Sequence, residues 1–489
     1  MKKLRELTAE IEILQWIGDM DMIPTGIFLD SRGVSEGALF AAIRGTRADG
    51  KEFIQDAVKN GARAIICEER PTNPFPGITY VVTANASAAL GLVASSWYEH
   101  PSRRMKVIGI TGTNGKTTIA TLLYQLFEAL GYPSGLLSTI RVSVHGDDEP
   151  ATHTTPDALS IQRHLARMVE AGCTHAFMEV SSHALHQNRV SGVSFAGAVF
   201  SNLTRDHLDY HPTFAQYLQA KKSLFDALGK NGFALINLDD KNGRVMVQNC
   251  RSKISTYSIR TAAGFHARIV EQHVDGMQIN LEGQELWVRF TGAFNASNLL
   301  AVYGAAMLLS QKSEEVIPLL SSLLPVEGRL ETIPLGNRIT GVVDYAHTPD
   351  ALENVLSTLR NLKGSGRIIT LFGAGGDRDK GKRPAMAEVA CRLSDLVIVT
   401  SDNPRSEDPM TIIRDIQEGI PVGKRSVVIS NADRREAIRT AFNLAKPGDI
   451  ILVAGKGHET YQEIHGVKHH FDDREELAAL ITDKQKLKY

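Results

Sequence analysis

Short apolar runs and longer amphipathic segments alternate along most of the chain. Runs such as ARAIICEE, HAFMEV and RIITLFG have the length and character of strands, whereas EFIQDAVKNG, IATLLYQLFEAL and ASNLLAVYGAAMLLS have the length and spacing of helices. Repeated alternation of strand and helix is typical of α/β domains in which the sheet is mostly parallel. The pattern therefore predicts an α/β fold.

The alternation falls into three segments, which we expect to form three domains. Residues 1–104 indicate a small α/β domain, residues 105–328 a larger one with a mostly parallel sheet, and residues 329–489 a third α/β domain. In the third segment each apolar strand leads into a polar loop, and ligands bind at that edge of open α/β sheets. Those polar loops are therefore candidate binding elements.

Composition and charge argue against several classes of function. The chain has 489 residues, of which 43% are hydrophobic and 22% charged, as in an ordinary globular protein. A net charge of −1 argues against a nucleic-acid-binding protein, which needs a basic excess to neutralise phosphates. The N-terminal segment MKKLRELTAEIEILQWIGDM has charges among its apolar residues, so we expect no signal peptide, no membrane insertion and a cytoplasmic protein.

The four cysteines suggest neither a zinc site nor a disulfide framework. Cys67, Cys173, Cys250 and Cys391 are widely separated and lack C-x-x-C spacing. We expect them to be buried free thiols.

A glycine-rich loop, GITGTNGKTT at residues 109–118, stands between a short strand and a helix. Main-chain N–H groups of residues 112–116 can bind phosphate oxygens there, with the positive end of the helix dipole behind them. Lys116 is placed to reach the outer phosphates, and Thr117 to offer its hydroxyl to Mg²⁺. The strict P-loop pattern has glycine where this chain has Ile110, so a glycine turn without a ligand is the alternative to a site for ATP or GTP.

Two further stretches of the middle segment combine residues suited to metal or phosphate chemistry. Glu179 ends a strand, where a carboxylate can hold Mg²⁺ directly or through water; a carboxylate that caps the next helix is the alternative. His207 lies in a polar loop, and Lys221 is on the helix that follows. The loop also carries Asp206, Asp209, Tyr210 and His211. Such crowding favours a metal or phosphate site over a solvated turn.

The third segment offers more polar groups at strand ends. Asp344 and His347 follow the strand ITGVVDY, a position suited to a ribose or a phosphate. The stretch GAGGDRDKGKRP is rich in glycine and cationic, and its basic residues are Arg378, Lys380, Lys382 and Arg383. Solvated charge is the alternative there, although glycines directly after a strand favour a binding loop. SDNPRSEDP and AGKGHETYQ also follow apolar strands.

Ten stretches of the chain resemble, in order, the motifs of the bacterial Mur ligases: GITGTNGKTT, MEVSSH, NLTRDHLD, AKKSLF, FNASNLLAV, VEGRLE, DYAHTP, GAGGDRDKGKRP, DNPR and GKGHE. The resemblance covers essentially the whole chain. It implies a UDP-sugar-binding domain at residues 1–104, a central P-loop ATP-binding domain at 105–328, and a Rossmann-like domain at 329–489 for an incoming amino acid. This division agrees with the three segments.

The family's reaction implies roles for the matching positions. ATP phosphorylates the D-glutamyl γ-carboxylate of UDP-N-acetylmuramoyl-L-Ala-D-Glu, and an amino acid's amine then displaces the phosphate, so the resemblance implies an ATP-dependent ligase of peptidoglycan synthesis. The implied catalytic residues are Lys116, Glu179, His207 and Lys221. The implied ATP contacts are Gly112, Thr113, Asn114, Gly115, Lys116, Thr117, Thr118, Asn295, Asn298, Arg329 and Asp344. Mg²⁺ is expected at Thr117, Glu179, His207 and Lys221, the last as a carbamate (N6-carboxylysine).

The resemblance also implies contacts to the UDP-sugar and its dipeptide. These positions are Leu29, Ser31, Thr46, Arg47, Ala48, His153, Thr154, Thr155, Ser181, Gln187 and Arg189. The family often has asparagine in place of His153, but a histidine can also donate or accept a hydrogen bond.

The stretch DNPR implies that the incoming amino acid is meso-diaminopimelate. The guanidinium of Arg405 can pair bidentately with a second carboxylate, which L-lysine lacks. The implied contacts are Arg378, Asp402, Asn403, Pro404, Arg405, Gly455 and Glu459, with Glu459 suited to the distal ammonium. If Arg405 faces solvent or pairs with Asp408, a lysine-adding ligase is the alternative.

Two other functions stay open. An enzyme like folylpolyglutamate synthetase shares the P-loop and central fold but has no reason to carry DNPR and GKGHE. A regulatory P-loop module would bind nucleotide without amino-acid-dependent turnover, and would leave the cationic loop unexplained. For the ligase we expect a monomer with hinges near Arg104 and Gly328, because nucleotide and amino acid are expected on different domains.

Overall fold

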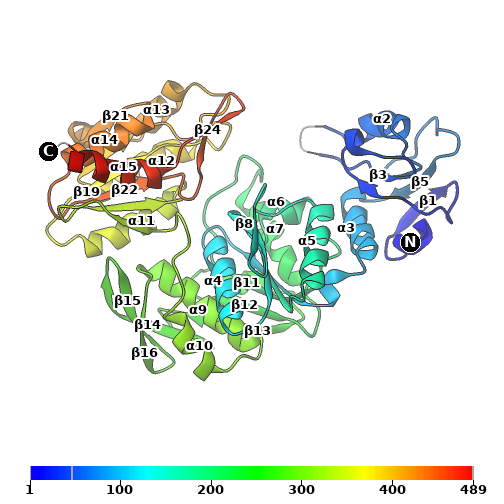
Figure 1. The fold of residues 1–489 in the computed structure, drawn as a ribbon, viewed down its shortest axis with the longest axis horizontal. Coiled ribbons are helices and arrows are strands. Elements are labelled where there is room, and N and C mark those ends of the chain that lie inside the picture. Colours follow the sequence, from blue (N-terminus) through cyan, green and yellow to red (C-terminus); the bar gives the residue numbers. More distant parts are fainter. Residues whose placement is uncertain (1, 46–47, 487–489) are drawn as a thin grey trace.

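Three α/β bodies follow one another along the chain, as Figure 1 shows. The structure is a computed structural model, and it describes residues 2–45 and 48–486. In Figure 1 the N-terminal body (blue) and the C-terminal body (yellow to red) lie on opposite sides of the central body (cyan and green). The predicted three-domain α/β fold is confirmed, whereas the domain limits at 104 and 328 stay predictions.

The N-terminal body is built on a sheet with strand order β1-β5-β4-β3-β2, in which β1 is antiparallel to β5 and the other neighbours are parallel. Its strands are β1 (Ile13–Ile17), β2 (Ile27–Phe28), β3 (Leu39–Ala41), β4 (Ala64–Cys67) and β5 (Thr79–Thr83). Its helices are α1 (Leu4–Leu7), α2 (Ile54–Lys59) and α3 (Ala86–Trp97). Asn85 caps α3 by accepting a hydrogen bond from Ala88 N at 2.8 Å.

The central body has a long sheet with strand order β16-β15-β14-β13-β12-β11-β6-β10-β7-β8-β9. Its strands are β6 (Lys106–Thr111), β7 (Ser134–Leu137), β8 (Arg141–Val144), β9 (Asp147–Pro150), β10 (His175–Glu179), β11 (Phe195–Phe200), β12 (Phe233–Asn237), β13 (Lys253–Ser258), β14 (Phe265–His273), β15 (Gly276–Leu281) and β16 (Gln284–Val288). Its helices are α4 (Lys116–Ala129), α5 (Ala158–Glu170), α6 (Ser182–His186), α7 (Phe214–Asp226), α8 (Gly243–Met246), α9 (Ala293–Leu308) and α10 (Ser313–Leu320).

Antiparallel strands extend this sheet at both ends, which the sequence pattern did not indicate. From β14 to β7 the neighbours are parallel, whereas β14–β16 and β7–β9 are antiparallel. Most residues of β14 are exposed or half-buried, and β9 has the polar sequence DDEP. Strands that bury so little give a weak apolar signal.

Helices cover both faces of the parallel middle of the central sheet. α4 and α9 share one apolar core with Ile110 and Phe177, and α5 and α7 share the other with Val107 and Phe200. Burial on both faces is typical of parallel strands. The register aligns Thr111 at the end of β6 with Phe200 at the end of β11, so these carboxyl ends meet at one edge.

The C-terminal body has the strand order β17-β18-β22-β19-β20-β21, with only β17 antiparallel to its neighbour among the described strands of this sheet. Its strands are β17 (Glu331–Pro334), β18 (Thr340–Asp344), β19 (Ile368–Phe372), β20 (Leu396–Val399), β21 (Val428–Ser430) and β22 (Ile450–Ala454), with the hairpin β23 (Tyr461–Ile464) and β24 (Val467–His470). Its helices are α11 (Pro349–Leu362), α12 (Lys382–Leu393), α13 (Pro409–Gln417), α14 (Arg434–Leu444) and α15 (Asp473–Lys486).

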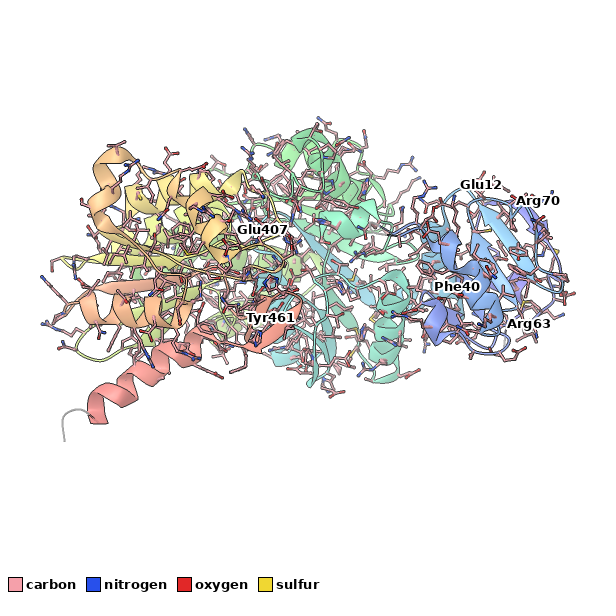
Figure 2. The ribbon with its side chains drawn as sticks, turned by 90° about the horizontal axis from the view of Figure 1, so that it is seen from above. Glu12, Phe40, Arg63, Arg70, Glu407 and Tyr461 are labelled. Carbon is pink, nitrogen blue, oxygen red and sulfur yellow. The ribbon has the colours of Figure 1, made fainter. Side chains whose placement is uncertain are left out.

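The central and C-terminal bodies contact each other at the P-loop. Asn114 Nδ2 and Thr204 Oγ1 donate hydrogen bonds to Asp350 Oδ2 at 3.0 and 3.3 Å. Arg329 NH2 donates to Thr117 Oγ1 at 3.0 Å. Figure 2 shows the two bodies from above, with the labelled residues Glu407 and Tyr461 on the side of the C-terminal body that is turned to the central body.

Two expectations about the chain as a whole concern its thiols and membranes. Cys67, Cys173 and Cys391 are buried free thiols, but Cys250 is partly exposed, so the prediction of burial is wrong for Cys250. Among the described residues, no helix combines the length and apolar character that crossing a membrane requires.

Candidate active site

The P-loop connects β6 to α4 and depends on two glycines. Gly112 (φ 154°) and Gly115 (φ 86°) have positive φ values that favour glycine. A Cβ on Gly112 would collide with the Ser201 hydroxyl, and a Cβ on Gly115 would lie 2.5 Å from Asn298 Oδ1. The two glycines therefore let the loop's main chain approach its neighbours closely.

Two buried ammonium groups converge on this loop. Lys116 Nζ donates to Gly112 O at 3.0 Å and to Thr113 O at 2.8 Å, and Lys221 Nζ donates to Gly112 O at 2.7 Å. Burial lowers the pKa of Lys116, although two nearby carboxylates oppose the shift. Burial, followed by the charge of Lys116, lowers the pKa of Lys221 well below its usual value. Lys221 therefore loses its proton far more readily than an ordinary lysine.

Glu179 lies fully buried at the end of β10 and binds the first turn of α4. Its Oε2 accepts a hydrogen bond from Thr117 Oγ1 at 3.1 Å, and its Oε1 accepts one from Thr139 N at 2.6 Å. The next helix, α6, is capped by Ser181, whose Oγ accepts from Ala184 N at 3.2 Å. Helix capping, the alternative role for Glu179, therefore belongs to Ser181.

The oxygens of Thr117 and Glu179 form a donor set that fits Mg²⁺. This ion prefers oxygen ligands and is commonly held by one or two carboxylates together with substrate phosphates. In residues 2–45 and 48–486, no group of three or more His, Cys, Asp or Glu side chains is placed to hold a metal ion by itself. The fit is therefore to an ion that takes its other ligands from phosphates and water.

A cavity of about 410 Å³ opens at the P-loop between the central and C-terminal bodies. We call it the nucleotide cavity, because most of the residues expected to bind ATP line it. Most residues expected to bind ATP line it: Thr113, Asn114, Gly115, Lys116, Thr117, Thr118, Asn295, Asn298, Arg329 and Asp344. Both carboxylate oxygens of Asp344 accept main-chain hydrogen bonds, from Leu330 N and Ala346 N, each at 2.7 Å. Burial raises the pKa of Asp344. A ribose contact would therefore have to use the remaining lone pairs of this carboxylate.

The polar loop that follows β11 divides between two cavities. His207 and Asp206 line the nucleotide cavity, with His207 Nε2 3.4 Å from Asp206 Oδ2. Desolvation lowers the pKa of His207, against the opposing charge of Asp206. The ring of Tyr210 packs on His183 at a centroid distance of 4.0 Å, and Tyr210 lines the second cavity. The aromatic and imidazole rings of this loop therefore pack against the histidines of α6, and its side chains do not form one cluster of ligands.

The second cavity, of about 520 Å³, lies between the N-terminal and central bodies. Three residues expected to bind the UDP-sugar substrate line it: His153, Gln187 and Arg189. Gln187 Oε1 accepts from Arg189 NH2 at 2.6 Å, and Gln187 Nε2 donates to Tyr210 OH at 2.9 Å. The polar groups of this cavity are therefore held in place before any ligand binds.

The main chain at residues 154–155 connects the two cavities. Thr155 Oγ1 donates to Glu179 O at 2.9 Å, and Thr155 O accepts from Arg189 NH1 at 2.9 Å. Thr154 lines the nucleotide cavity. Because His153 lines the second cavity, two consecutive residues of the chain line the two cavities.

The other residues expected at the UDP-sugar are farther from the second cavity or outside the described structure. Leu29 packs against the apolar core of the N-terminal body, and Ser31 is buried. Ala48 is exposed. Thr46 and Arg47 lie outside the described residues, so their predicted role has no structural counterpart here.

The loops after β20 and β22 form a buried charged cluster, here called the C-terminal cluster. Asn403 Nδ2 donates to Glu459 Oε2 at 2.7 Å, and Lys456 Nζ lies 3.4 Å from the same oxygen. A Cβ on Gly455 (φ 113°) would lie 2.5 Å from Asp402 Oδ2, so the two loops touch. Burial, and then Asp402, raise the pKa of Glu459. The cluster and its rim contain most residues expected to bind diaminopimelate: Asp402, Asn403, Pro404, Arg405, Gly455 and Glu459.

Arg405 lies at the rim of this cluster and is 23% exposed. Its NH1 donates to Gly376 O at 2.7 Å, and its Nε lies 3.6 Å from Glu463 Oε2. Asp408 caps α13 instead, because its carboxylate accepts from Thr411 N at 3.0 Å. Neither condition for the lysine-adding alternative, an Arg405 turned to solvent or paired with Asp408, is met.

Two arginines of the cationic stretch GAGGDRDKGKRP have different surroundings. Arg378 is exposed and flanks Gly375 together with Arg405, since a Cβ on Gly375 would lie 2.8 Å from Arg405 NH1 and 3.7 Å from Arg378 Cγ. Arg383 is fully buried and pairs with Glu407 at 2.8 Å. The expectation that Arg383 is available to a ligand is therefore wrong, because its guanidinium is already bound by carboxylates.

Lys382 and His347 interact electrostatically with groups of both the nucleotide cavity and the C-terminal cluster. His347 lines the nucleotide cavity, and burial followed by the charge of Lys382 lowers its pKa to about 4. The charge of Lys382 acts on Asp206 on one side and on Asp402 on the other. The two groups of polar residues are thus within electrostatic reach of each other.

Sequence reasoning missed two polar residues of the site. Lys456 holds Glu459, and Asp350 receives a hydrogen bond from the P-loop. Lys456 belongs to the recognised stretch GKGHE, and Asp350 directly follows the recognised stretch DYAHTP as the second residue of α11. Their place in or next to a recognised stretch was the available signal, but it does not say which polar residue near a strand end turns inward.

Family models match three parts of the chain. Residues 24–95 match the model described as Mur ligase family, catalytic domain; residues 110–306 match the Mur ligase middle domain; and residues 328–457 match the Mur ligase, glutamate ligase domain.

Curated relatives match over nearly the full length. The UDP-N-acetylmuramoyl-L-alanyl-D-glutamate--2,6-diaminopimelate ligase of Bacteroides thetaiotaomicron is 53% identical over 480 residues, which are 98% of this chain and 100% of that protein. The protein of the same name from Bacteroides fragilis is 52% identical and covers 98% of this chain and 99% of its own length.

Solved structures show the same architecture. A structure of UDP-N-acetylmuramoyl-L-alanyl-D-glutamate--2,6-diaminopimelate ligase has a TM-score of 0.69 at 35% identity and covers 99% of both chains. The MurF ligase of Thermotoga maritima in complex with ADP has a TM-score of 0.64 at 18% identity, covering 96% of this chain and 100% of its own. A Mycobacterium tuberculosis folylpolyglutamate synthase has a TM-score of 0.62 at 18% identity and covers 76% of this chain and 92% of its own, a likeness of fold alone.

Proposed function

The chain belongs to the Mur ligase family, and from that premise we propose that it joins 2,6-diaminopimelate to UDP-N-acetylmuramoyl-L-Ala-D-Glu at the expense of ATP. Relatives of at least half-identical sequence carry the name of that ligase. The observation that carries the proposal is the adjacency of the P-loop cavity and the C-terminal cluster, because Tyr345 lines that cavity and its hydroxyl lies 3.5 Å from Glu459 Oε1. A module that only binds nucleotide has no use for the C-terminal cluster.

In the first step a γ-carboxylate oxygen of the D-glutamyl residue attacks the γ-phosphorus of ATP, the bond to the bridging oxygen breaks, and ADP leaves. Lys116 and the main-chain N–H groups of the P-loop neutralise the phosphates. Thr113 and Asn114 belong to the same loop, Thr118 lies in the first turn of α4, and Asn295 and Asn298 line the same cavity. Arg329 reaches Thr117 from the C-terminal side and adds positive charge there.

In the second step the amine of diaminopimelate attacks the carbonyl carbon of the acyl phosphate. The amine loses its proton, the carbon–oxygen bond to phosphate breaks, and inorganic phosphate leaves with the former carboxylate oxygen. Contacts such as Asn114 to Asp350 hold the C-terminal body over the P-loop, which limits hydrolysis of the acyl phosphate. The chemistry is therefore mainly positioning and charge neutralisation.

The residues that would hold Mg²⁺ are Thr117, Glu179 and His207, which line the same cavity, together with a carbamylated Lys221. Bound there, the ion neutralises phosphate charge. The lowered pKa of Lys221 favours its neutral amine, which can add to CO₂ with loss of a proton to give a carbamate. A carbamate is an anionic oxygen ligand, whereas an ammonium would repel the ion.

Choice of amino acid rests on the C-terminal cluster. Arg405 offers its guanidinium, with Arg378 beside it, to the distal carboxylate that lysine lacks. Glu459, held by Asn403 and Lys456, is placed for the distal ammonium. We assign the UDP-sugar and the L-Ala residue to the second cavity, near His153, Gln187 and Arg189. We also infer that the enzyme works as a monomer in the cytoplasm, where ATP and UDP-linked precursors are found.

The test is phosphate release by the purified protein with ATP, Mg²⁺ and UDP-N-acetylmuramoyl-L-Ala-D-Glu, supplied in parallel with meso-diaminopimelate or L-lysine. We expect rapid release with diaminopimelate and little with lysine. Preference for lysine would overturn the assignment of Arg405, and release with neither amino acid would return the protein to the nucleotide-binding modules.

A further inference from the structure

A buried ion pair lies directly beneath the C-terminal cluster. Arg434, the first residue of α14, and Asp473, the first residue of α15, have fully buried side chains. Arg434 Nε donates to Asp473 Oδ1 at 2.8 Å, and Arg434 NH2 donates to Asp473 Oδ2 at 2.7 Å. The pairing is bidentate, so it fixes the plane of the guanidinium.

The remaining N–H groups of Arg434 bind two strand ends. NH1 donates to Ser401 O at 3.2 Å, and NH2 donates to Ala454 O at 3.0 Å. Ala454 is the last residue of β22, and Ser401 follows β20 by two residues. These strands are not neighbours, because β19 lies between them in the sheet.

The two carbonyls directly precede the residues that face the proposed substrate. Ser401 is followed by Asp402 and the stretch DNPR, and Ala454 is followed by Gly455 and the stretch GKGHE. Ladder pairing with β19 ends at Val399 on one side and at Ala454 on the other, so the ladder no longer sets the spacing of the two loops. Arg434 bridges the carboxyl ends of β20 and β22, because it donates to both carbonyls.

We propose that Arg434, held by Asp473, is a positioning residue that sets the spacing between the DNPR and GKGHE loops and thereby the affinity for the incoming amino acid. This inference rests on the proposed function, because it assigns the two loops to diaminopimelate. Arg434 also places a positive charge near Asp402, whose pKa is lowered by Lys456 and Arg434 against the effect of burial. A lysine cannot replace it, since a single ammonium cannot pair bidentately and also reach both carbonyls.

The same sheet provides a matched control at its opposite edge. Arg367 and Asp449 precede β19 and β22, with Arg367 NH2 2.7 Å from Asp449 Oδ2. Arg367 NH2 also donates to a main-chain carbonyl, that of Leu444, at 2.7 Å. The Arg367–Asp449 pair thus joins the amino ends of β19 and β22, whereas Arg434 joins the carboxyl ends of β20 and β22. The Arg367–Asp449 pair is remote from the DNPR and GKGHE loops.

The experiment compares Arg434→Lys with Arg367→Lys in the full-length protein. We measure Tm and the KM values for diaminopimelate, ATP and the UDP-sugar dipeptide. For Arg434→Lys we expect a KM for diaminopimelate raised about tenfold or more, with the other two KM values and the kcat at saturation near those of the wild type. Arg367→Lys should lower Tm but leave all three KM values unchanged.

A second variant keeps the test decisive if Arg434→Lys does not fold. Arg434→Met combined with Asp473→Leu removes both charges and leaves neither unpaired, which buried pairs often tolerate. It should also raise the KM for diaminopimelate, because the two carbonyls lose their common donor. An unchanged KM for diaminopimelate in a folded Arg434 variant, or an equal rise of all three KM values, would overturn the inference. Failure of the wild type to use diaminopimelate would overturn the proposed function instead.

Discussion

The two sides of the proposed site hold their charges differently. On the nucleotide side, Lys116 donates to main-chain carbonyls of the P-loop rather than to a carboxylate. On the amino-acid side, Lys456 faces Glu459 at 3.4 Å, and Arg405 faces Glu463 at 3.6 Å. The first side therefore leaves the charge of Lys116 available to a ligand, whereas the second side pairs its cations with its own carboxylates.

This difference matches the two kinds of ligand. A triphosphate is strongly anionic, and a cation that is not paired directly with a carboxylate attracts it. Diaminopimelate carries charges of both signs, so its recognition depends on where each charge lies rather than on a net field. We infer that the nucleotide side supplies charge stabilisation and the amino-acid side supplies discrimination.

The largest effect is expected at Lys221. Lys221→Ala should lower kcat by roughly 10²–10³-fold, the usual result of losing one group that stabilises a transition state. Added short-chain carboxylates should restore part of the activity by taking the place of the carbamate. Steady-state phosphate release measures both effects.

Two comparisons make the Lys221 result specific. Lys221→Arg keeps a cation that cannot form a carbamate, so its activity should be as low as that of Lys221→Ala. Lys222→Met is the matched control, because the neighbouring Lys222 pairs with Asp226 on the same helix and should be dispensable for turnover. Full activity of Lys221→Arg would mean that Lys221 acts as a cation, as Lys116 does.

A smaller effect is expected at Arg405. Arg405→Ala should lower kcat/KM for diaminopimelate by roughly 10- to 100-fold, the value of a hydrogen bond to a charged group, and leave the KM for ATP unchanged. The same variant should lose its preference over L-lysine. Parallel assays with both amino acids measure this, and a change in the KM for ATP of similar size would erase the distinction between the two sides.

The two sides should also respond to pH in opposite directions. Glu459 must be ionised to bind an ammonium, and because burial raises its pKa, kcat/KM for diaminopimelate should fall as the pH drops towards that raised pKa. Lys116 must be protonated to bind phosphates, and because burial lowers its pKa, kcat/KM for ATP should fall as the pH rises. Each loss should approach about tenfold per pH unit beyond the pKa.

Profiles of kcat/KM against pH for each substrate, with the others saturating, measure this opposition. Glu459→Gln should raise the KM for diaminopimelate and abolish the fall of kcat/KM for diaminopimelate at low pH. The fall of kcat/KM for ATP at high pH should remain. If both profiles fall at low pH, or both fall at high pH, Glu459 and Lys116 do not control the binding of the two substrates.

The smallest effect is expected at Asp408. Asp408→Ala removes the cap of α13 and should lower Tm without changing the KM for diaminopimelate, since Arg405 does not depend on it. Thermal unfolding and the diaminopimelate assay measure the two quantities. A rise in KM like that of Arg405→Ala would show that Asp408 supports Arg405 after all.

The fold and the placement of the P-loop residues could be predicted from the sequence because their signals are local. A strand, a glycine-rich loop and a helix are contiguous, so Lys116 and Thr117 are placed by their neighbours in the chain. The antiparallel strands β14 and β16 escaped prediction because most of their residues are exposed or half-buried, whereas β15 between them buries Met277, Ile279 and Leu281.

The amino-acid side depends on contacts that the sequence does not display. Glu459 is held by Asn403, 56 positions away, and Arg434 binds Asp473, 39 positions away. The burial of Arg383 shows the same limit, because one arginine of a cationic run is structural while its neighbour Lys382 faces the site. Only the folded chain distinguishes them.

The most direct test of the central claim follows oxygen from the substrate carboxylate. The D-glutamyl γ-carboxylate is labelled with oxygen-18, and the phosphate released in the presence of ATP and diaminopimelate is analysed by mass spectrometry. If nucleotide and amino acid meet across an acyl phosphate, each phosphate carries one labelled oxygen and the amide retains the other. Unlabelled phosphate, with both labelled oxygens left on the peptide, would contradict the claim that the two sides act on one carboxylate.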